Sequence, residues 1–488
     1  MIVDNTARQN FAGFKILWFR WEGIMKKINL LLIVAVLMSI LSGCSSSSAL
    51  ELPTNPNIKE DTNDSFSEEQ PGEGSVPEEQ DTVNTKEAGR QVLTITAYEM
   101  HRDYLTAKKN KFLESHPDVD IQLTFYPGYT SATNNPYITR VATDLMGGNA
   151  SDIIQIDNPI LWQYGKQGYY EGLYQYLEQD EDISKESFYP EMLKALEIED
   201  ELYILPVTIF YTVLLLNTDY TEMLQDELAG KYTLTYYDLA ELCDIVKSSL
   251  PEDAILYPTN GYSAKNALVA EMGTYFDRNE KYVDFRHATD LIEFVEPYTV
   301  PGRNEAFITA PDENSLFTEL ATASGGSWPA INADYSFEGG GYLLANTEGE
   351  IQFHLDFAYA INSLSDNKEL AWEFLKFSTK DVHDRGDGIY IVQYIPARQD
   401  EFWNNYTQHM KDAFEAWSNP LVKDEEYVQS VFERMQEFQY MLNNYGNGGS
   451  TVFWEALEPA AKEYGLGLID AQGLADRMQE KMEATVNE

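Results

Sequence analysis

The stretch VLTITAY at residues 92–98 begins the part of the chain that decides the fold. Its β-branched and aromatic residues predict a strand. The following segments alternate between helical spacing and strand-like apolar patterns: helices are predicted over 104–115 and 139–146, and strands over 119–125 and 152–156. The order β-α-β-α-β predicts an α/β layered domain with a mostly parallel sheet.

Candidate ligand contacts follow two of these strands. In open α/β sheets, ligands bind beyond the carboxyl ends of the strands. Tyr98 ends the first predicted strand, and Asp157-Asn158 follow the third. We therefore expect these residues to meet at one edge. The alternative for Asp157 and Asn158 is a helix N-cap ahead of Pro159.

The later part of the chain carries further α/β signals. The apolar run over 202–216 is interrupted by Pro206, which predicts two short strands flanking a crossing segment. A helix is predicted over 234–249, with Leu239, Leu242, Ile245 and Val246 on one face and Cys243 in the core. A short strand is predicted over 358–361, and further helices are predicted over 368–377 and 471–482.

The N-terminal segment has the pattern of a secretion signal. Met25-Lys26-Lys27 precede an apolar run over 28–41, which is short for a membrane span. The run ends in LSGC at 41–44, which resembles the lipobox of bacterial lipoproteins. The resemblance implies that residues 25–43 are a signal peptide and that Cys44 is lipidated. The alternative is an ordinary membrane anchor with a chance cysteine.

The segments on either side of the signal are expected to lie outside the fold. Residues 1–24 are interpreted as an overcalled start, with translation beginning at Met25. Residues 44–90 are rich in Glu, Asp, Pro, Gly and Ser and almost lack aromatics. Such a segment cannot bury enough surface to offset its ordering entropy, so it predicts a disordered acidic tether. A long tether suits a Gram-positive surface protein.

Composition excludes several classes of function. The 488-residue chain has a formal net charge of −46, which disfavours nucleic-acid partners. Its 2 cysteines and 6 histidines form no disulfide framework and no metal-ligand spacing. We expect no cofactor and no metal.

Four stretches carry a resemblance to a known family. They are SDIIQIDN at 151–158 with QGYYEGL at 167–173, LYILP at 202–206 continuing to Tyr220, NKELAWEFLKF at 367–377, and IPAR at 395–398. In this order they resemble the extracellular solute-binding proteins of bacterial sugar importers, the group that includes maltose-binding protein. The third stretch is the most specific, and each of the others is weak alone.

The resemblance implies a periplasmic-binding-protein-like fold of two α/β lobes with a ligand cleft between them. Lobe 1 would comprise residues 91–208 plus 359–394, and lobe 2 residues 209–358 plus 395–488. Crossing segments would lie near 208–212, 356–360 and 394–398. The implied function is capture of an extracellular carbohydrate and its delivery to the membrane subunits of an ABC importer. The protein would be a monomer, anchored by lipid at the outer face of the cell membrane.

Aromatic residues near these segments are the other candidate contacts. A sugar site needs aromatic platforms for the ring faces and polar groups for the hydroxyls. Trp328 in GGSWP at 325–329 and Tyr211 at the first crossing are expected to contact the ligand, and so are Tyr98, Trp454 and Tyr394. For each of them the alternative is packing in a core or a hinge.

Two other functions stay open at this point. A secreted carbohydrate-active enzyme would share the acidity and the aromatic content, and it would use two carboxylates. With 80 acidic residues, the presence of a carboxylate pair decides nothing. A ligand sensor presenting to a membrane kinase would share the fold. The ordered resemblance, with no nucleophile or metal motif recognised, favours a binding protein without catalytic residues.

Overall fold

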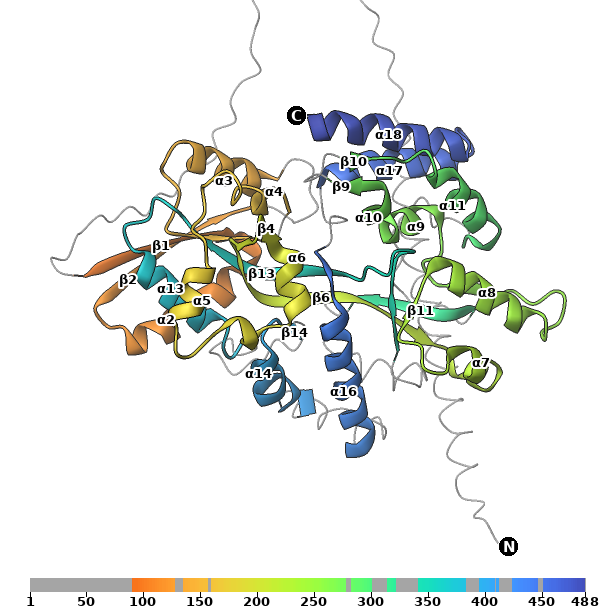
Figure 1. Cartoon of the computed structure of the whole chain (residues 1–488), viewed down its shortest axis with the longest axis horizontal. Coiled ribbons are helices and arrows are strands. Elements are labelled where there is room, and N and C mark those ends of the chain that lie inside the picture. Colours follow the sequence, from red (N-terminus) through yellow and green to blue (C-terminus); the bar gives the residue numbers. More distant parts are fainter. Residues whose placement is uncertain are drawn as a thin grey trace, which may run out of the picture. The chain divides into compact units, whose positions relative to one another are not determined.

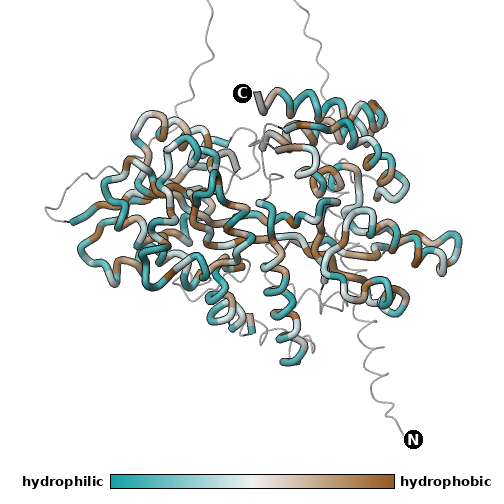
Figure 2. The backbone as a smooth tube through the Cα atoms, viewed as in Figure 1, coloured by the Kyte–Doolittle hydropathy of each residue, from teal (hydrophilic) through white to brown (hydrophobic). Residues whose placement is uncertain are grey.

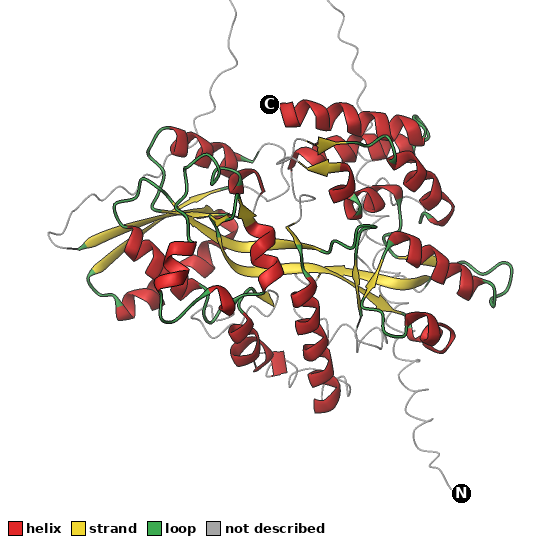
Figure 3. Ribbon diagram, in the orientation of Figure 1, coloured by secondary structure: helices red, strands yellow, loops and turns green. Residues whose placement is uncertain are grey.

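The computed structural model describes residues 90–127, 135–156, 159–277, 282–300, 314–321, 341–382, 395–408, 410–411, 424–445 and 451–487. Within these ranges, helices flank a set of long and short strands (Figure 3). The α/β prediction is confirmed.

Three parallel strands begin the sheet as the sequence predicts. β1 (Gln91–Tyr98) pairs along its whole length with β2 (Val119–Tyr126) and at its end with β3 (Ile153–Gln155). Helices α2 (Arg102–Ser115) and α3 (Pro136–Met146) connect them. The start of α3 is fixed locally, because Asn135 Oδ1 accepts a hydrogen bond from the Tyr137 N–H at 3.0 Å.

The sheet as a whole is mixed, so the parallel arrangement predicted from residues 92–156 holds for β1, β2 and β3 and does not extend to the strands that follow. Its strand order is β2-β1-β3-β13-β6-β11-β8. β13 (Gln352–Ile361) runs antiparallel to both β3 and β6 (Leu205–Leu216), and β11 (Ser315–Ala321) runs antiparallel to β6. The direction changes because the chain leaves the first group of strands through β6 and returns through β13.

The run that contains Pro206 forms one strand instead of the two that were predicted. Pro206 is the second residue of the 12-residue strand β6, and Ala358 is its partner on β13. A proline near the start of a strand removes one N–H but leaves the following ladder intact. The strand therefore continues through the segment that was expected to be a crossing.

The remaining described strands are short. They are β4 (Glu197–Ile198), β5 (Glu201–Leu202), β7 (Thr233–Leu234), β8 (Tyr257–Thr259), β9 (Phe276–Asp277), β10 (Tyr282–Val283), β12 (Tyr342–Leu344), β14 (Ile395–Pro396) and β15 (Asn444–Tyr445).

Two hydrophobic cores lie along the long strands. Figure 2 colours the backbone by hydropathy, and apolar segments occur along these strands. Around the first core and its edges are α2, α3, α4 (Pro159–Trp162), α5 (Tyr174–Gln179), α6 (Pro190–Leu196), α13 (Lys368–Ser378), α14 (Gln399–Glu401) and α16 (Glu425–Met441). Around the second are α7 (Thr221–Leu228), α8 (Tyr236–Lys247), α9 (Ala264–Ala270), α10 (Met272–Tyr275), α11 (Ala288–Val295), α17 (Thr451–Gly465) and α18 (Ala471–Asn487). Short helical segments are η1 (Glu99–His101), η2 (Lys185–Ser187), η3 (Thr218–Tyr220), η4 (Glu296–Tyr298) and η5 (Phe402–Tyr406).

The C-terminal region is shared between the two cores. Ile395, Phe402, Phe432 and Tyr445 pack in the first core, whereas the buried side chains of α17 and α18 pack in the second. The family resemblance predicted that all of 395–488 belongs to the second lobe. This prediction differs from the structure because the apolar side chains of α16 pack on the first core. The chain enters the second core only with α17, which follows α16.

Helix α8 illustrates how far periodicity determines a buried face. Leu239, Leu242, Cys243 and Val246 are buried as predicted. Ile245 is 39% exposed, so its assignment to the same face is wrong.

Among the helices within the described ranges, we find none with the length and apolar character that a membrane span requires.

Candidate functional site

Strand β6 connects the two cores, and its two faces differ. Side chains at odd positions from Val207 to Leu215 are buried in the first core, whereas Leu214 and Leu216 at even positions are buried in the second. Between the cores, Phe210 and Thr212 on the even face are only half-buried. Phe210 and Thr212 therefore keep part of their surface exposed where β6 runs from one core to the other; Figure 1 shows the course of this strand.

A second aromatic side chain lies beside Phe210 on this face. Phe210 pairs across the strands with His354 of β13. The two rings are stacked, with centroids 4.9 Å apart and an interplanar angle of 24°. His354 is half-buried, and so is Gln352 two residues away, which shares its face. Gln352 Nε2 donates to the Val269 carbonyl at 3.1 Å, which links β13 to α9 of the second core.

Toward the first core, the same face carries a histidine. Phe357 of β13 pairs with Thr208, and the His101 ring packs on Phe357 with centroids 4.3 Å apart. A ring nitrogen of His101, Nδ1, lies 2.6 Å from Gln155 Nε2, and its Nε2 finds no hydrogen-bond partner among the described residues. His101 thus lies near the carboxyl ends of β1 and β3, the edge at which α/β sheets bind ligands.

Toward the second core, the face carries a carboxylate. Glu319 of β11 pairs with Leu214 of β6, so it projects from the face that also presents Phe210. Glu319 Oε1 accepts hydrogen bonds from Thr259 Oγ1 at 2.5 Å and from the Tyr236 hydroxyl at 3.4 Å. The Asn260 side chain accepts from the Glu319 N–H at 2.8 Å. The carboxylate is half-buried and held from several elements.

Both histidines on this face are neutral at physiological pH. Burial lowers the pKa of His354 to about 4. Burial also lowers the pKa of His101 to about 4, although its hydrogen bond with Gln155 works in the opposite direction. Neutral imidazoles offer hydrogen-bonding atoms and flat ring faces without attracting anions.

Two of the predicted contact residues are described, and both are buried. The Tyr98 ring is fully buried, packs on Tyr137 with centroids 3.8 Å apart, and its hydroxyl accepts a hydrogen bond from Asn135 Nδ2 at 3.2 Å. Tyr211 is also fully buried, and its hydroxyl donates to the Met435 carbonyl of α16 at 3.4 Å. Tyr98 therefore lies at the predicted edge, whereas Tyr211 lies on the opposite face of β6 from Phe210.

The other predicted residues lie outside the described part of the chain. They are Asp157, Asn158, Trp328, Tyr394, the lipidation residue Cys44 and the side chain of Trp454. By chain continuity, Asp157 and Asn158 follow Ile156, which directly succeeds β3. Contact between these residues and a ligand stays a prediction.

His101, His354 and Glu319 are not among the site residues predicted from the sequence. One signal was present for Phe210: once Tyr211 is placed on one face of a strand, its neighbour must lie on the other. His354 and Glu319 carry no local signal, because only the pairing of β13 and β11 with β6 brings them to this face. The described residues contain no cluster of His, Cys, Asp and Glu that could hold a metal ion.

Comparison with solved structures shows which known proteins share this fold. The fold resembles an extracellular solute-binding protein family 1 member from Alicyclobacillus acidocaldarius, with a TM-score of 0.58 and 13% identity over 82% of this chain and 98% of that one. It also resembles the sugar-binding protein MalE from Xanthomonas citri, with a TM-score of 0.54 and 12% identity over 81% and 98%. A periplasmic oligogalacturonide binding protein from Yersinia enterocolitica gives a TM-score of 0.54 and 13% identity over 81% and 99%.

The sequence itself supplies the family assignment. No curated protein sequence matches the chain significantly. However, the family described as bacterial extracellular solute-binding protein matches residues 101–382, which is more than half of the chain. The predicted two-lobed solute-binding fold is thereby confirmed, and the chain belongs to the bacterial extracellular solute-binding protein family.

Proposed function

We propose that this protein captures an extracellular saccharide between its two lobes and delivers it to an ABC-type importer without converting it. The observation that carries the proposal is the half-buried Phe210–His354 pair on strands that link the two cores of a solute-binding chain. Aromatic rings suit the apolar faces of sugar rings, and the flanking polar groups suit their hydroxyls.

The lobes in this proposal correspond to the two hydrophobic cores. β6 and β13 join the cores, so a change in their twist or bend would move one core relative to the other. Closing the lobes on a ligand would bring residues beyond the carboxyl ends of β1 and β3 toward those of the second core. Asp157, Asn158, Trp328, Trp454 and Tyr394 are proposed as contacts in that state. The Tyr98 and Tyr211 side chains are fully buried in the described arrangement, so their contact with a ligand stays a prediction from the sequence.

The proposal includes a lipid anchor at the outer face of the cell membrane. It rests on the signal pattern that ends in LSGC at 41–44. Lipidation at Cys44 and the acidic segment over 44–90 would hold the binding domain near the membrane while leaving it free to meet the importer.

Ligand binding without turnover is the decisive test of this function. A thermal-shift screen of the full chain against mono- and oligosaccharides should raise the melting temperature with the correct sugar, because a ligand that binds the folded state stabilises it. The 8 tryptophans allow the same titration to be followed by intrinsic fluorescence.

Product analysis of the same mixtures separates binding from catalysis. Chromatography of the sugar after prolonged incubation should recover it unchanged. Release of a shortened or rearranged sugar would assign the protein to the carbohydrate-active enzymes instead. The absence of any stabilising saccharide would count against the sugar assignment.

A further inference from the structure

We propose that the loop over 346–350, which connects β12 to β13, is a clasp that holds the segment 271–273 of the second core against the first core. In this clasp, the contact between Glu271 and Thr347 sets how easily the two cores change their relative position. The inference goes beyond the proposed function, because neither residue has to touch a saccharide and the arrangement of the cores can be measured without one.

The clasp loop is tied to the first core. Ile351, which follows the loop, is buried in the first core, and its N–H donates to Asn443 Oδ1 at 2.7 Å. Asn444 Nδ2 donates to Glu350 Oε2 at 2.7 Å. Asn444 belongs to β15, which pairs in parallel with the start of β13, and the next residue of β15, Tyr445, is buried in the first core. These contacts attach the loop to the strands of the first core.

Asn346 fixes the shape of the clasp loop. Its side chain is buried, and its Oδ1 accepts hydrogen bonds from the N–H groups of Glu348 at 3.1 Å and Glu350 at 2.7 Å. Its Nδ2 donates to Glu350 Oε2 at 2.8 Å. Gly349, at a φ of 83°, completes the turn and donates its N–H to the Asn346 carbonyl at 3.0 Å. Thr347 is therefore presented from a loop whose backbone is held at several points.

The second core supplies a buried carboxylate that receives Thr347. Glu271 lies between α9 and α10, is 1% exposed, and is followed by Met272, which packs in the second core. It accepts the Thr347 N–H at 3.0 Å on both oxygens and the Thr347 hydroxyl at 2.7 Å on Oε2. Burial raises the pKa of Glu271, and the hydrogen bonds from Thr347 oppose this rise. Separating the two residues would leave a buried carboxylate with fewer donors, which is unfavourable.

Two further contacts lie at the same boundary. A β-carbon at Gly273 of α10 would overlap with Glu350 Oε2 and would lie 3.1 Å from Asn444 Nδ2, so the glycine allows α10 to approach the clasp loop closely. Gln352 Nε2 donates to the Val269 carbonyl at 3.1 Å, and Val269 packs against the second core. The clasp thus joins the cores beside the start of β13.

The clasp acts on a boundary that the chain crosses by strands. β6 and β13 run between the cores, and the chain passes after β15 from the first core to α17 of the second. A change in the relative position of the cores moves the clasp loop relative to 271–273 and strains the Glu271–Thr347 contact. The contact therefore favours the described arrangement over others, and its loss shifts the populations.

Double electron–electron resonance tests the inference on the full chain without a saccharide. Spin labels are attached at Met146→Cys on α3 of the first core and at Glu480→Cys on α18 of the second, both at exposed positions. A Cys44→Ala background leaves the buried Cys243 as the remaining thiol. We expect Thr347→Val and Glu271→Gln each to change the ratio of the populated inter-core distances about tenfold. The double variant should add little to either single change, because both remove the same contact.

Matched variants show whether the contact itself is responsible. Glu348→Gln removes a charge from an exposed side chain of the same loop and should leave the distances as in the wild type. Gly273→Ala displaces Glu350 without altering Glu271 or Thr347 and should shift the distances as the clasp variants do. Circular dichroism spectra equal to wild type establish that each variant is folded. Unchanged distances in the folded Thr347 and Glu271 variants, or an equal shift in Glu348→Gln, would overturn the clasp.

Calorimetric titration with maltotriose, cellotriose and trigalacturonic acid relates the clasp to the proposed function. In that function the cores approach each other on a saccharide, so closing has to strain the clasp. For any probe that the wild type binds, Thr347→Val and Glu271→Gln should therefore bind it up to about tenfold more tightly. Equal or weaker binding contradicts a clasp that restrains closing. Failure of the wild type to bind any saccharide counts against the proposed function, whereas the distance measurement decides the clasp independently.

Discussion

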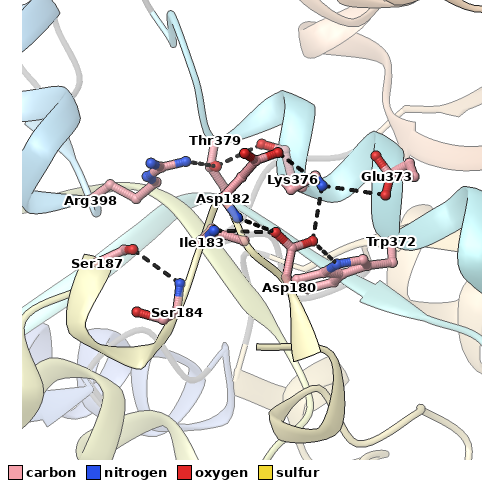
Figure 4. A network of polar contacts seen from close by, with 10 residues as sticks. All are labelled: Asp180, Asp182, Ile183, Ser184, Ser187, Trp372, Glu373, Lys376, Thr379 and Arg398. Carbon is pink, nitrogen blue, oxygen red and sulfur yellow. Dashed lines mark hydrogen bonds and ion pairs between the residues drawn. The ribbon is translucent and has the colours of Figure 1, made fainter. Parts of the chain in front are cut away.

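At the residue scale, the most family-like stretch of the sequence has a clear structural role. Trp372 and Lys376 of NKELAWEFLKF lie one turn apart on α13, and both donate to Asp180 Oδ2 at 2.9 Å (Figure 4). The other oxygen of Asp180 accepts from the backbone N–H groups of Asp182 at 2.8 Å and Ile183 at 3.2 Å. These contacts fix the loop after α5 against α13.

The ionisation of Asp180 links this network to pH. Burial opposes the charged form, but the hydrogen bonds from Lys376 and Trp372 outweigh it, so the pKa of Asp180 lies below its ordinary value of 3.8. A carboxylate with a lowered pKa stabilises the fold above its ordinary pKa. That contribution is lost as the pH falls through the lowered pKa of the folded state.

We predict that Asp180→Asn reduces the free energy of unfolding at pH 7 by about 1–3 kcal/mol, because it weakens charge-assisted hydrogen bonds at a side chain that is 7% exposed. Urea denaturation at pH 7 and at pH values below 3.8 measures the effect. The difference from wild type should shrink in acid, where wild-type Asp180 also becomes protonated.

The neighbouring acid is the control for this prediction. Asp182 also approaches Lys376, at 3.4 Å, but its side chain is 63% exposed. Asp182→Asn should change stability by less than about 0.5 kcal/mol. Equal losses in the two variants, or a loss at Asp180 that persists unchanged in acid, would contradict the role assigned to the Asp180 network.

At the element scale, α16 connects the two cores on the face of β6 opposite Phe210. Its side chains Val431, Phe432, Met435 and Phe438 pack in the first core. Arg434 on the same helix reaches the second group of strands: its guanidinium donates to the carbonyls of Lys231 at 3.1 Å and Gly341 at 3.4 Å. The guanidinium carbon also lies 3.7 Å from the centroid of the Tyr232 ring. Helix α16 therefore contacts both the first core and the segments around β7 and β12.

We predict that Arg434→Gln lowers the free energy of unfolding by about 1–2 kcal/mol, because it removes both the cation–π contact and charge-assisted donors from a side chain that is 17% exposed. Guanidinium denaturation followed by circular dichroism measures the loss. Glu433→Gln, on an exposed position of the same helix, is the control and should be neutral within about 0.5 kcal/mol. A neutral Arg434 variant would show that α16 is held by its apolar side chains alone.

At the scale of the whole molecule, the net charge of the chain bears on how the protein can be held at a membrane. The formal charge of −46 disfavours adsorption to anionic lipid surfaces, so membrane attachment requires a specific anchor. The proposed anchor is a lipid on Cys44, because that cysteine ends the predicted secretion signal.

We predict that Cys44→Ala moves the protein from the membrane fraction to the soluble fraction, including the culture medium, in a bacterial host that lipidates lipoproteins. Fractionation followed by immunoblotting measures the distribution. The saccharide affinity of the released protein should equal that of wild type, because the substitution lies outside the binding domain. Retention in the membrane fraction would contradict anchoring by lipid at this residue.

Local sequence patterns determined the first elements of the fold. β1, α2, β2, α3 and β3 lie where periodicity and helix-ending residues predicted them, because these elements depend on neighbours that are close in the chain. The same holds for α13 and for the buried face of α8 apart from Ile245. The family resemblance was also readable from the sequence, because its motifs occur in order along the chain.

Only the tertiary structure decided which side chains share the face between the cores. Phe210, His354 and Glu319 come from three strands whose pairing depends on register, and a shift of one residue would turn each side chain to the opposite face. The single strand through Pro206 and the packing of α16 on the first core also follow from long-range contacts. Periodicity along one segment cannot encode these contacts, because their energy depends on residues that are distant in the sequence.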